Sequence, residues 1–236
     1  MPFPLVPVII AGVVGFFAGA VAVNLYDESQ RKVVGKKFGL LGERATGKTT
    51  LIYFLQTGRI NKNVKPTQAP DNFPVSERSF TASGNHGTTR TFPIKMKEGV
   101  DVGGGASNYE TWQKIVKDTD ILLYLFRADK ALENDTHHCK RIKKDISQIY
   151  KWLDERKTAT ETKPKFFAIG THCDLSDEFN FQTIDERVEY IKDEFSDLPL
   201  IREIYAATGT PIILGSLDDE QKARGIVVQL FKHINT

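Results

Sequence analysis

The sequence predicts an α/β protein built on a mostly parallel, doubly wound sheet with one antiparallel edge strand. Two short apolar runs, 120–126 and 165–170, have the composition of strands that are covered on both faces. Helical patterns over 132–157 and 218–233 alternate with these strands. Because strands that alternate with helices form a parallel sheet with helices on its faces, this order indicates the fold class.

The strongest local pattern is the sequence Gly42-Glu43-Arg44-Ala45-Thr46-Gly47-Lys48-Thr49, which matches G-x-x-x-x-G-K-[ST]. In such a loop, backbone N–H groups surround a polyphosphate, Lys48 reaches its β- and γ-phosphates, and the Thr49 hydroxyl binds Mg²⁺. An apolar strand at 37–41 precedes the loop, and a helix from Thr50, ending near Gly58, follows it. The positive end of that helix favours the anion. A glycine-rich structural turn is the alternative interpretation.

Length and composition restrict the class of protein. A chain of 236 residues fits one ordinary domain with an appendage. The net charge of +2 is too small to suggest nucleic acid as a partner. The two cysteines, Cys139 and Cys173, do not make a disulfide framework, so we expect a reducing compartment.

The N-terminal residues predict a membrane anchor. The run Pro2–Val23 has no charged residue and, as a helix, is long enough to cross a hydrocarbon layer about 30 Å thick. The cations follow this run, at Arg31, Lys32, Lys36 and Lys37. By the positive-inside rule, the C-terminal side is then cytoplasmic. We expect an uncleaved transmembrane helix over residues 1–25, a linker over 26–35 and a cytoplasmic domain over 36–236.

Two other features of this segment leave alternatives open. Ala20-Val21-Ala22 resembles a signal-peptide cleavage site, although no Lys or Arg precedes the apolar run and the run is long for a signal peptide. Gly15 and Gly19 form a G-x-x-x-G pattern that could let two anchors pair, which would make the protein a homodimer.

The middle of the chain carries a second group of candidate residues. A predicted loop after the first helix contains Thr67, which is placed to approach a nucleotide. Strands at 75–82 and 90–100 predict an antiparallel hairpin at the edge of the sheet. Asp101 ends a strand, and glycines follow it at 103–105. In this arrangement the aspartate suits a contact on the Mg²⁺ side of a nucleotide, and the glycines suit a backbone N–H that donates to a γ-phosphate. The alternative interpretation is a flexible turn.

Asp174 is the candidate residue for recognising a base. The segment Thr171-His172-Cys173-Asp174 follows the strand at 165–170, at the edge of the sheet where α/β proteins bind ligands. A carboxylate there can accept two hydrogen bonds from the N1–H and 2-amino groups of guanine, and adenine offers no such pair. An aspartate that caps the next helix is the alternative.

The remaining segments supply helices, a last strand and one apparent metal motif. Helices are predicted over 109–117, with Trp112, Ile115 and Val116 facing inward, and over 184–195. His137, His138 and Cys139 do not complete a recognised set of metal ligands, so we expect a partly exposed helix start there. A strand at 211–214 leads into Gly215-Ser216-Leu217.

This order of motifs resembles the small GTPases of the Ras superfamily, most of all the Arf-like branch and the β-subunit of the signal recognition particle receptor. The resemblance covers roughly residues 36–235 and implies a P-loop NTPase fold. It also implies that Thr67 is the switch threonine that closes on Mg²⁺ and the γ-phosphate. Asp101-Val102-Gly103-Gly104 matches the D-V-G-G string of the Arf-like group. By the same resemblance, residues 171–174 occupy the position of the family's N-K-x-D motif, and the loop 215–217 lies behind the nucleotide base.

The predicted site residues fall into three groups. Nucleotide contacts are expected from Gly42, Glu43, Arg44, Ala45, Thr46, Gly47, Lys48, Thr49, Thr50, Thr171, His172, Asp174, Ser216 and Leu217. Mg²⁺ contacts are expected from Thr49, Thr67 and Asp101. Catalytic contacts are expected from Lys48, Thr67 and Gly104.

Three departures from the family pattern affect the expected activity. Gly105 stands where the family usually has the glutamine that orients the attacking water, so intrinsic hydrolysis is in doubt. Asn108 or a partner could supply the missing group. His172 replaces the usual lysine, and its imidazole could stack on the base instead. The stretch from Thr67 to Asp101 is also longer than the family pattern by about a hairpin.

We therefore expect a membrane-anchored switch that binds GTP or GDP with Mg²⁺, hydrolyses GTP slowly or with a partner's help, and recruits a cytoplasmic protein. Two alternatives from other classes remain. One is an ATP-using enzyme in which Asp129 is the carboxylate for Mg²⁺. The other is a non-hydrolysing membrane scaffold, which Gly105 favours.

Overall fold

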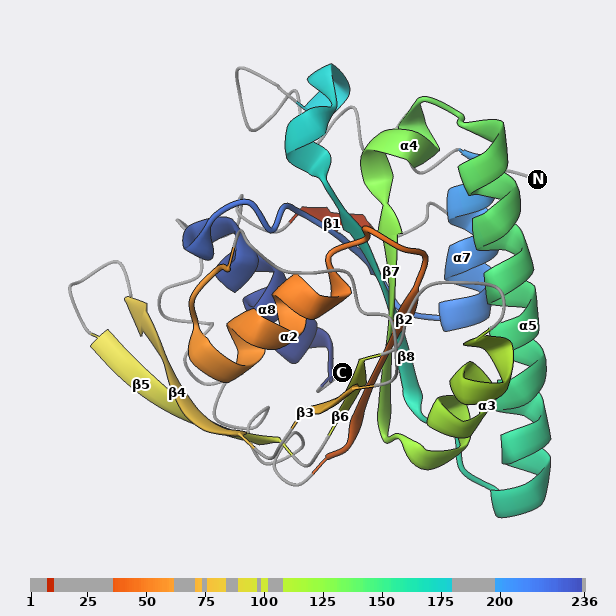
Figure 1. The fold of residues 1–236 in the computed structure, drawn as a ribbon, viewed down its shortest axis with the longest axis horizontal. Helices are drawn as coiled ribbons and strands as arrows, with labels where there is room; N and C mark the ends of the chain where they lie inside the picture. The colour runs from red at the N-terminus through yellow and green to blue at the C-terminus, as the bar shows by residue number, and fades with distance from the viewer. Residues whose placement is uncertain are drawn as a thin grey trace.

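The computed structural model describes residues 8–10, 36–61, 71–73, 76–83, 89–96, 99–101, 108–179 and 198–234. These residues form an α/β fold whose main sheet has the strand order β1-β9-β8-β7-β2-β6-β3 (Figure 1). Its strands are β1 (Val8–Ile10), β2 (Phe38–Gly42), β3 (Asp71–Phe73), β6 (Gly99–Asp101), β7 (Ile121–Arg127), β8 (Lys165–Thr171) and β9 (Ile212–Leu214). Neighbouring strands are parallel, except that β3 runs antiparallel to β6. The predicted α/β class is confirmed.

Helices cover both faces of the sheet (Figure 1). On one face lie α2 (Lys48–Thr57) and α8 (Glu220–Ile234). On the other lie α3 (Tyr109–Asp118), α5 (Thr136–Thr160) and α7 (Pro199–Thr208). The short elements are α4 (Ala128–Leu132), η3 (Cys173–Leu175) and η4 (Asp177–Phe179).

Alternation of side chains along the strands divides the core in two. Leu123 and Leu125 of β7 pack in the cluster that α2 and α8 cover, together with Leu230 of α8. Leu122 and Tyr124 pack in the cluster under α3, α5 and α7. Both clusters are buried, which is why β7 reads as a continuous apolar run rather than an alternating one.

Close packing at β2 requires glycine at two positions. A Cβ atom on Gly39 would lie 2.4 Å from Cγ2 of Ile115, so glycine there lets α3 approach the sheet. A Cβ atom on Gly42 would lie 2.2 Å from the carbonyl oxygen of Leu125, and the φ of Gly42 is +141°. Gly42 therefore fixes where β2 ends and the loop begins.

The N-terminal segment differs from the predicted transmembrane helix at Val8–Ile10. These three residues form strand β1, which pairs in parallel with β9 in the register Val8↔Ile212. Valine and isoleucine favour extended backbone, and pairing satisfies the backbone groups along β9. The rest of the predicted anchor lies outside the described residues. Within the described ranges, no helix is long and apolar enough to cross a membrane.

The predicted edge hairpin is present but lies elsewhere. β4 (Ser76–Ser83) and β5 (Thr89–Met96) pair antiparallel and form a two-stranded sheet of their own, not the edge of the main sheet. The strand predicted over 90–100 is thus two strands, β5 and β6. Pro93 in β5 has no N–H to donate to a further strand, which suits a small separate sheet.

Two helix predictions also change. The helix predicted over 132–157 is divided, because Asn134 has a φ of +52° and Asp135 caps α5 by accepting from the N–H of His138. Helix α7 was not predicted, and the helix predicted over 184–195 lies outside the described residues. The inward positions predicted for α3 are confirmed by their burial.

Candidate nucleotide site

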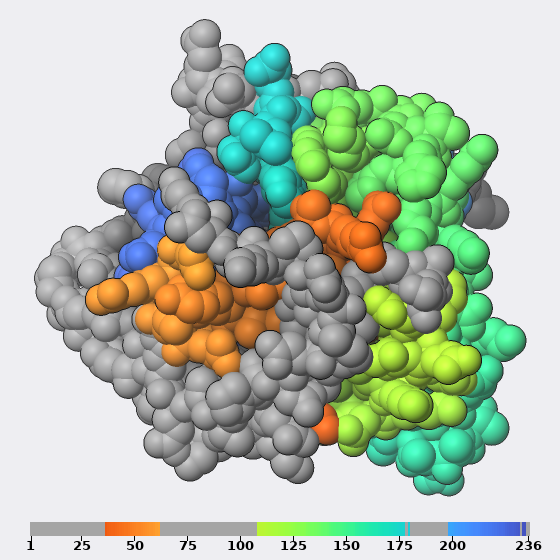
Figure 2. Space-filling model, viewed as in Figure 1, coloured from red at the N-terminus to blue at the C-terminus, as the bar shows by residue number. Residues whose placement is uncertain are grey.

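The candidate site lies where the strand order reverses. From β2 the chain continues to β6 on one side, and from β6 it crosses to β7 on the other side of β2. Ligands of open α/β sheets bind at the carboxyl ends of the strands at such a point. In Figure 2 the orange segment 36–61 reaches the surface there, beside the cyan end of 165–179 and the green start of α5.

The loop 42–49 is held by contacts to its own carbonyl groups. The Lys48 ammonium donates to the carbonyl oxygens of Gly42 at 3.0 Å and Glu43 at 2.7 Å. The Thr46 hydroxyl donates to the same Glu43 oxygen at 2.9 Å. The Lys48 side chain therefore lies across the loop and is buried, with an exposed fraction of 6%. This places a cation inside the curve of the loop, where a polyphosphate would be drawn to it.

The backbone of the loop has the conformation of an anion-binding turn. Gly47, with a φ of +82°, caps the start of α2, and Ala45 also has a positive φ of +58°. A positive φ at alanine is strained, and such strain is concentrated at functional sites. Thr49 and Thr50 lie half-buried in the first turn of α2, where backbone N–H groups have no helical partner.

Thr171 links the second predicted segment to this loop. Its buried hydroxyl lies 3.1 Å from the carbonyl oxygen of Thr46 in the loop and 3.1 Å from that of Phe126 in β7. The end of β8 is therefore joined to both the phosphate loop and β7, although Thr46 and Thr171 are far apart in sequence.

The His172 ring lies against Thr171, the residue before it. Its φ is +62°, and its Nδ1 lies 2.8 Å from the Thr171 hydroxyl. Burial lowers the pKa of His172 below its ordinary value of 6.5, and the Arg127 charge acts in the same direction. The neutral form of the ring is therefore favoured. Its stacking on a base stays a prediction.

Asp174 and Ser216, which the family resemblance assigns to the base-binding region, lie in contact. The buried Ser216 hydroxyl donates to Oδ1 of Asp174, whose side chain is exposed. The Cys173 N–H donates to the carbonyl oxygen of Gly215 at 3.3 Å, which joins the two loops along their backbones. Leu217 packs on the phosphate loop, since a Cβ atom on Gly47 would lie 2.7 Å from its Cδ1. The Ser216 hydroxyl thus orients the Asp174 carboxylate, which remains exposed to solvent.

The predicted Mg²⁺ and catalytic residues are only partly described. Thr67, predicted for both roles, and Gly104, predicted to be catalytic, lie outside the described residues. Asp101 ends β6 beside Leu40, two residues before the loop begins at Gly42. The hydroxyl of Thr49 and a carboxylate are the hard oxygen donors that Mg²⁺ prefers. Within the described part of the chain, no group of three or more His, Cys, Asp or Glu side chains could hold a metal ion.

Asp129, the carboxylate of the ATP-enzyme alternative, is engaged by a guanidinium. Arg127 Nε donates to Oδ1 of Asp129 at 3.1 Å, and Arg127 Nη2 contacts Oδ2. Burial acts to raise the pKa of Asp129, but the hydrogen bonds and charge of Arg127 outweigh it and hold the pKa below its usual value. Both oxygens are therefore occupied by a cation from the protein itself.

Sequence reasoning missed one residue at the site. The predicted helix start is present and partly exposed, with His137 exposed, but His138 is buried, with an exposed fraction of 6%. Its Nδ1 lies 2.7 Å from Oε2 of Glu43 in the phosphate loop. The helical pattern around His138 carries no signal for this contact, because the partner is 95 positions away in the sequence.

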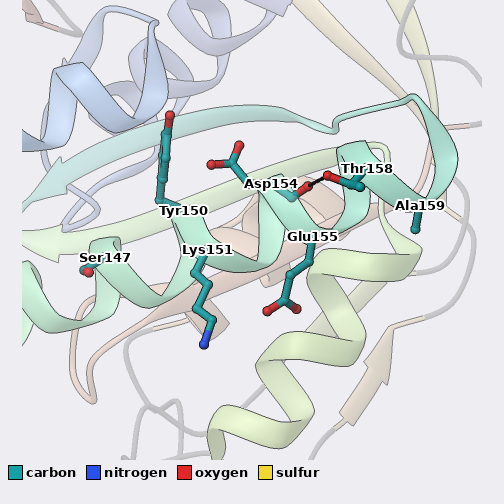
Figure 3. Close-up of a pocket in the computed structure, with 7 residues that line it drawn as sticks. All are labelled: Ser147, Tyr150, Lys151, Asp154, Glu155, Thr158 and Ala159. Carbon is teal, nitrogen blue, oxygen red and sulfur yellow. Dashed lines mark hydrogen bonds between the residues drawn. The ribbon is translucent and has the colours of Figure 1, made fainter.

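The described surface also has a shallow hollow of about 770 Å³ away from this site (Figure 3). It lies along α5 alone and is lined by Ser147, Tyr150, Lys151, Asp154, Glu155, Thr158 and Ala159. None of the predicted site residues lines it, and a groove on the side of one helix lacks the convergent polar groups of a ligand site.

No family model matches the sequence, and no curated protein matches it. The function is therefore argued from the geometry of the site.

Proposed function

We propose that this protein is a GTP-binding switch with a P-loop NTPase fold. The observation that carries the proposal is a single edge of the sheet on which a G-x-x-x-x-G-K-[ST] loop and a serine-held aspartate stand together, joined through Thr171. The loop supplies what any nucleoside polyphosphate needs. Asp174 supplies a group that distinguishes guanine from adenine.

On the phosphate side, Lys48 is the principal residue. Its ammonium rests on two loop carbonyls, so a bound β- or γ-phosphate oxygen replaces neutral acceptors with charged ones. The N–H groups at the start of α2 add fixed partial charges that need no rearrangement. Gly104 is proposed to add a backbone N–H to the γ-phosphate.

On the base side, Ser216 positions the recognising group. Its hydroxyl occupies one oxygen of Asp174, which fixes the rotation of the carboxylate. Because the carboxylate is already fixed and exposed, it can accept hydrogen bonds from the two adjacent donors of guanine and loses little conformational freedom on binding. Adenine has no such donor pair, and its N1 lone pair would face the carboxylate.

Thr49, Thr67 and Asp101 are the residues proposed to hold Mg²⁺, which supplies neutralisation of phosphate charge when bound. Gly105 has no side chain to orient a water molecule, so we expect slow hydrolysis unless a partner completes the site. Ordering of the segments around Thr67 and Gly104 by GTP would form the surface that recruits a cytoplasmic protein.

The deciding experiment measures binding of GTP, GDP and ATP to the full-length protein in mild detergent with Mg²⁺. We expect GTP and GDP to bind and ATP to compete poorly. Lys48→Ala should weaken every nucleotide by about 100-fold, because a charge-assisted contact is lost. Asp174→Ala should weaken GTP and GDP by about 10- to 100-fold and leave ATP unchanged.

Asp177→Ala is the matched control, since Asp177 is an exposed aspartate on the same stretch of chain. Equal binding of ATP and GTP, or indifference to Asp174→Ala, would reject guanine recognition and favour the ATP-using enzyme. Tight GTP binding without any turnover, alone or with a membrane fraction, would favour the non-hydrolysing scaffold.

A further inference from the structure

His138 connects three elements at the phosphate loop. Its ring Nδ1 lies 2.7 Å from Oε2 of Glu43 in the loop, and its Nε2 lies 3.3 Å from the backbone N of Arg127 at the end of β7. Its own backbone N–H donates to the Asp135 carboxylate at 2.9 Å, at the cap of α5. The ring is 7% exposed, so water does not substitute readily for these partners.

The Arg127 contact fixes which ring nitrogen carries the proton. A backbone N–H can only donate, so Nε2 of His138 must be the acceptor and must present its lone pair. In the neutral ring the proton is then on Nδ1, which donates it to the Glu43 carboxylate. The environment thus selects one tautomer, and the bond to Glu43 is charge-assisted.

Glu43 is the residue through which this bond reaches the loop. Its carbonyl oxygen accepts both the Lys48 ammonium at 2.7 Å and the Thr46 hydroxyl at 2.9 Å. Its side chain, at 23% exposed, is the part that His138 holds. Fixing the Glu43 side chain therefore fixes the backbone group on which the Lys48 side chain rests.

We propose that His138 is a positioning residue of the phosphate loop. It acts through Glu43, without touching the nucleotide, and holds the loop in the shape that places Lys48 before any phosphate arrives. This inference rests on the proposed nucleotide function for its effect on affinity, whereas the tautomer and the order of the unliganded loop follow from the contacts alone.

The first test needs no nucleotide. The ¹⁵N shifts of the ring nitrogens in histidine-labelled protein report which nitrogen is protonated, and the His138→Asn spectrum assigns the signal among the chain's five histidines. In the neutral ring we expect the proton on Nδ1. A neutral ring protonated at Nε2 would overturn the proposal.

The second test separates the two arms of the ring. An asparagine amide reaches the place of Nδ1 and keeps a donor for Glu43, while a glutamine amide reaches the place of Nε2 and keeps an acceptor for Arg127 only. We expect His138→Gln and Glu43→Ala each to lower GTP affinity by about tenfold, since a charge-assisted bond is lost. The double variant should lose no more than either single one. His138→Asn should recover most of the loss.

The control is His137→Gln, an exposed neighbour on the same helix turn, which should bind GTP as the original protein does. Amide hydrogen exchange of the unliganded loop should be faster in His138→Gln and Glu43→Ala and unchanged in His137→Gln. If the original protein binds no GTP, the proposed function fails while exchange and tautomer still test His138. Unchanged exchange in both loop variants, or additive losses of affinity, would reject the positioning role.

Discussion

The two faces of the sheet are built differently. Toward α2 and α8, β7 presents Leu123 and Leu125 to a cluster of apolar side chains. Toward α3 and α5, the residue between them is Tyr124, whose hydroxyl lies 3.2 Å from Asp145. Asp145 is fully buried and also accepts from Arg141 Nε at 2.7 Å and from the hydroxyl of Tyr109.

The difference matters because the two kinds of packing constrain geometry unequally. Apolar contacts are non-directional, so the α2 and α8 face resists unfolding without fixing fine orientation. The hydrogen bonds of Asp145 fix α3 and α5 against β7 at particular angles. Helix α5 also carries His138, two turns before Asp145, which holds the phosphate loop through Glu43. Changes on the polar face should therefore reach the loop, and changes on the apolar face should not.

The largest effect is expected at Asp145. Asp145→Ala removes the buried carboxylate that accepts from Arg141, which is 14% exposed, and from two tyrosine hydroxyls. We expect the free energy of unfolding to fall by about 3–5 kcal/mol, measured by urea denaturation, and amide exchange in the phosphate loop to rise. Asp145→Asn keeps an acceptor and should lose less. No loss of stability in Asp145→Asn would show that the buried charge is unimportant.

On the apolar face, Leu230→Ala provides the contrasting test. Leu230 is fully buried on α8, and its truncation leaves a cavity that should cost about 2–5 kcal/mol of unfolding free energy. Exchange of the phosphate-loop amides in the folded protein should stay as it is in the original chain. If Leu230→Ala speeds exchange in the loop as much as an Asp145 variant with the same loss of stability, the two faces do not differ in their effect on the loop.

The smallest effect is expected in the pH dependence of stability. Burial and the neighbouring Asp145 charge raise the pKa of Tyr124 above its ordinary value of 10.0, and burial also raises that of Tyr109. Above pH 10 the unfolded chain loses these protons while the folded protein keeps them, so stability should fall as pH rises.

Urea midpoints measured from about pH 8 to about pH 11, on either side of the ordinary tyrosine pKa, measure this fall. Tyr124→Phe should lower stability by about 0.5–1.5 kcal/mol at pH 7 and flatten the alkaline fall. Tyr150→Phe, at an exposed tyrosine, is the matched control and should neither lower the stability at pH 7 nor flatten the alkaline fall. If the stability of Tyr124→Phe falls with pH as steeply as that of the original protein, groups other than Tyr124 cause the fall.

Local patterns were sufficient for the parts of the site that are contiguous in sequence. The phosphate loop was predicted because strand, loop and helix follow one another from Phe38 to Thr57, and each has its own signal. The buried strands β7 and β8 were predicted from continuous apolar runs. The meeting of Asp174 and Ser216 followed from the order of segments that the family resemblance supplied.

Contacts between distant segments were beyond sequence reasoning. Nothing around His138 indicates Glu43 as its partner, since an amphipathic pattern marks a buried position without saying what it faces. The division between α4 and α5 depends on a positive φ at Asn134, which asparagine permits but does not require. The strand at Val8–Ile10 was read as membrane helix because apolar, β-branched residues suit a lipid layer and a sheet equally well.

The pairing of β1 with β9 has a consequence for how the protein behaves when it is shortened. With β1 in place, the backbone groups of Ile212–Leu214 on that side are paired. A chain trimmed to begin near residue 36 would leave three consecutive apolar residues as an unprotected edge, which is a template for joining to a second chain. Self-association of such a trimmed protein would then reflect the removal of its own covering strand, and not a natural oligomer.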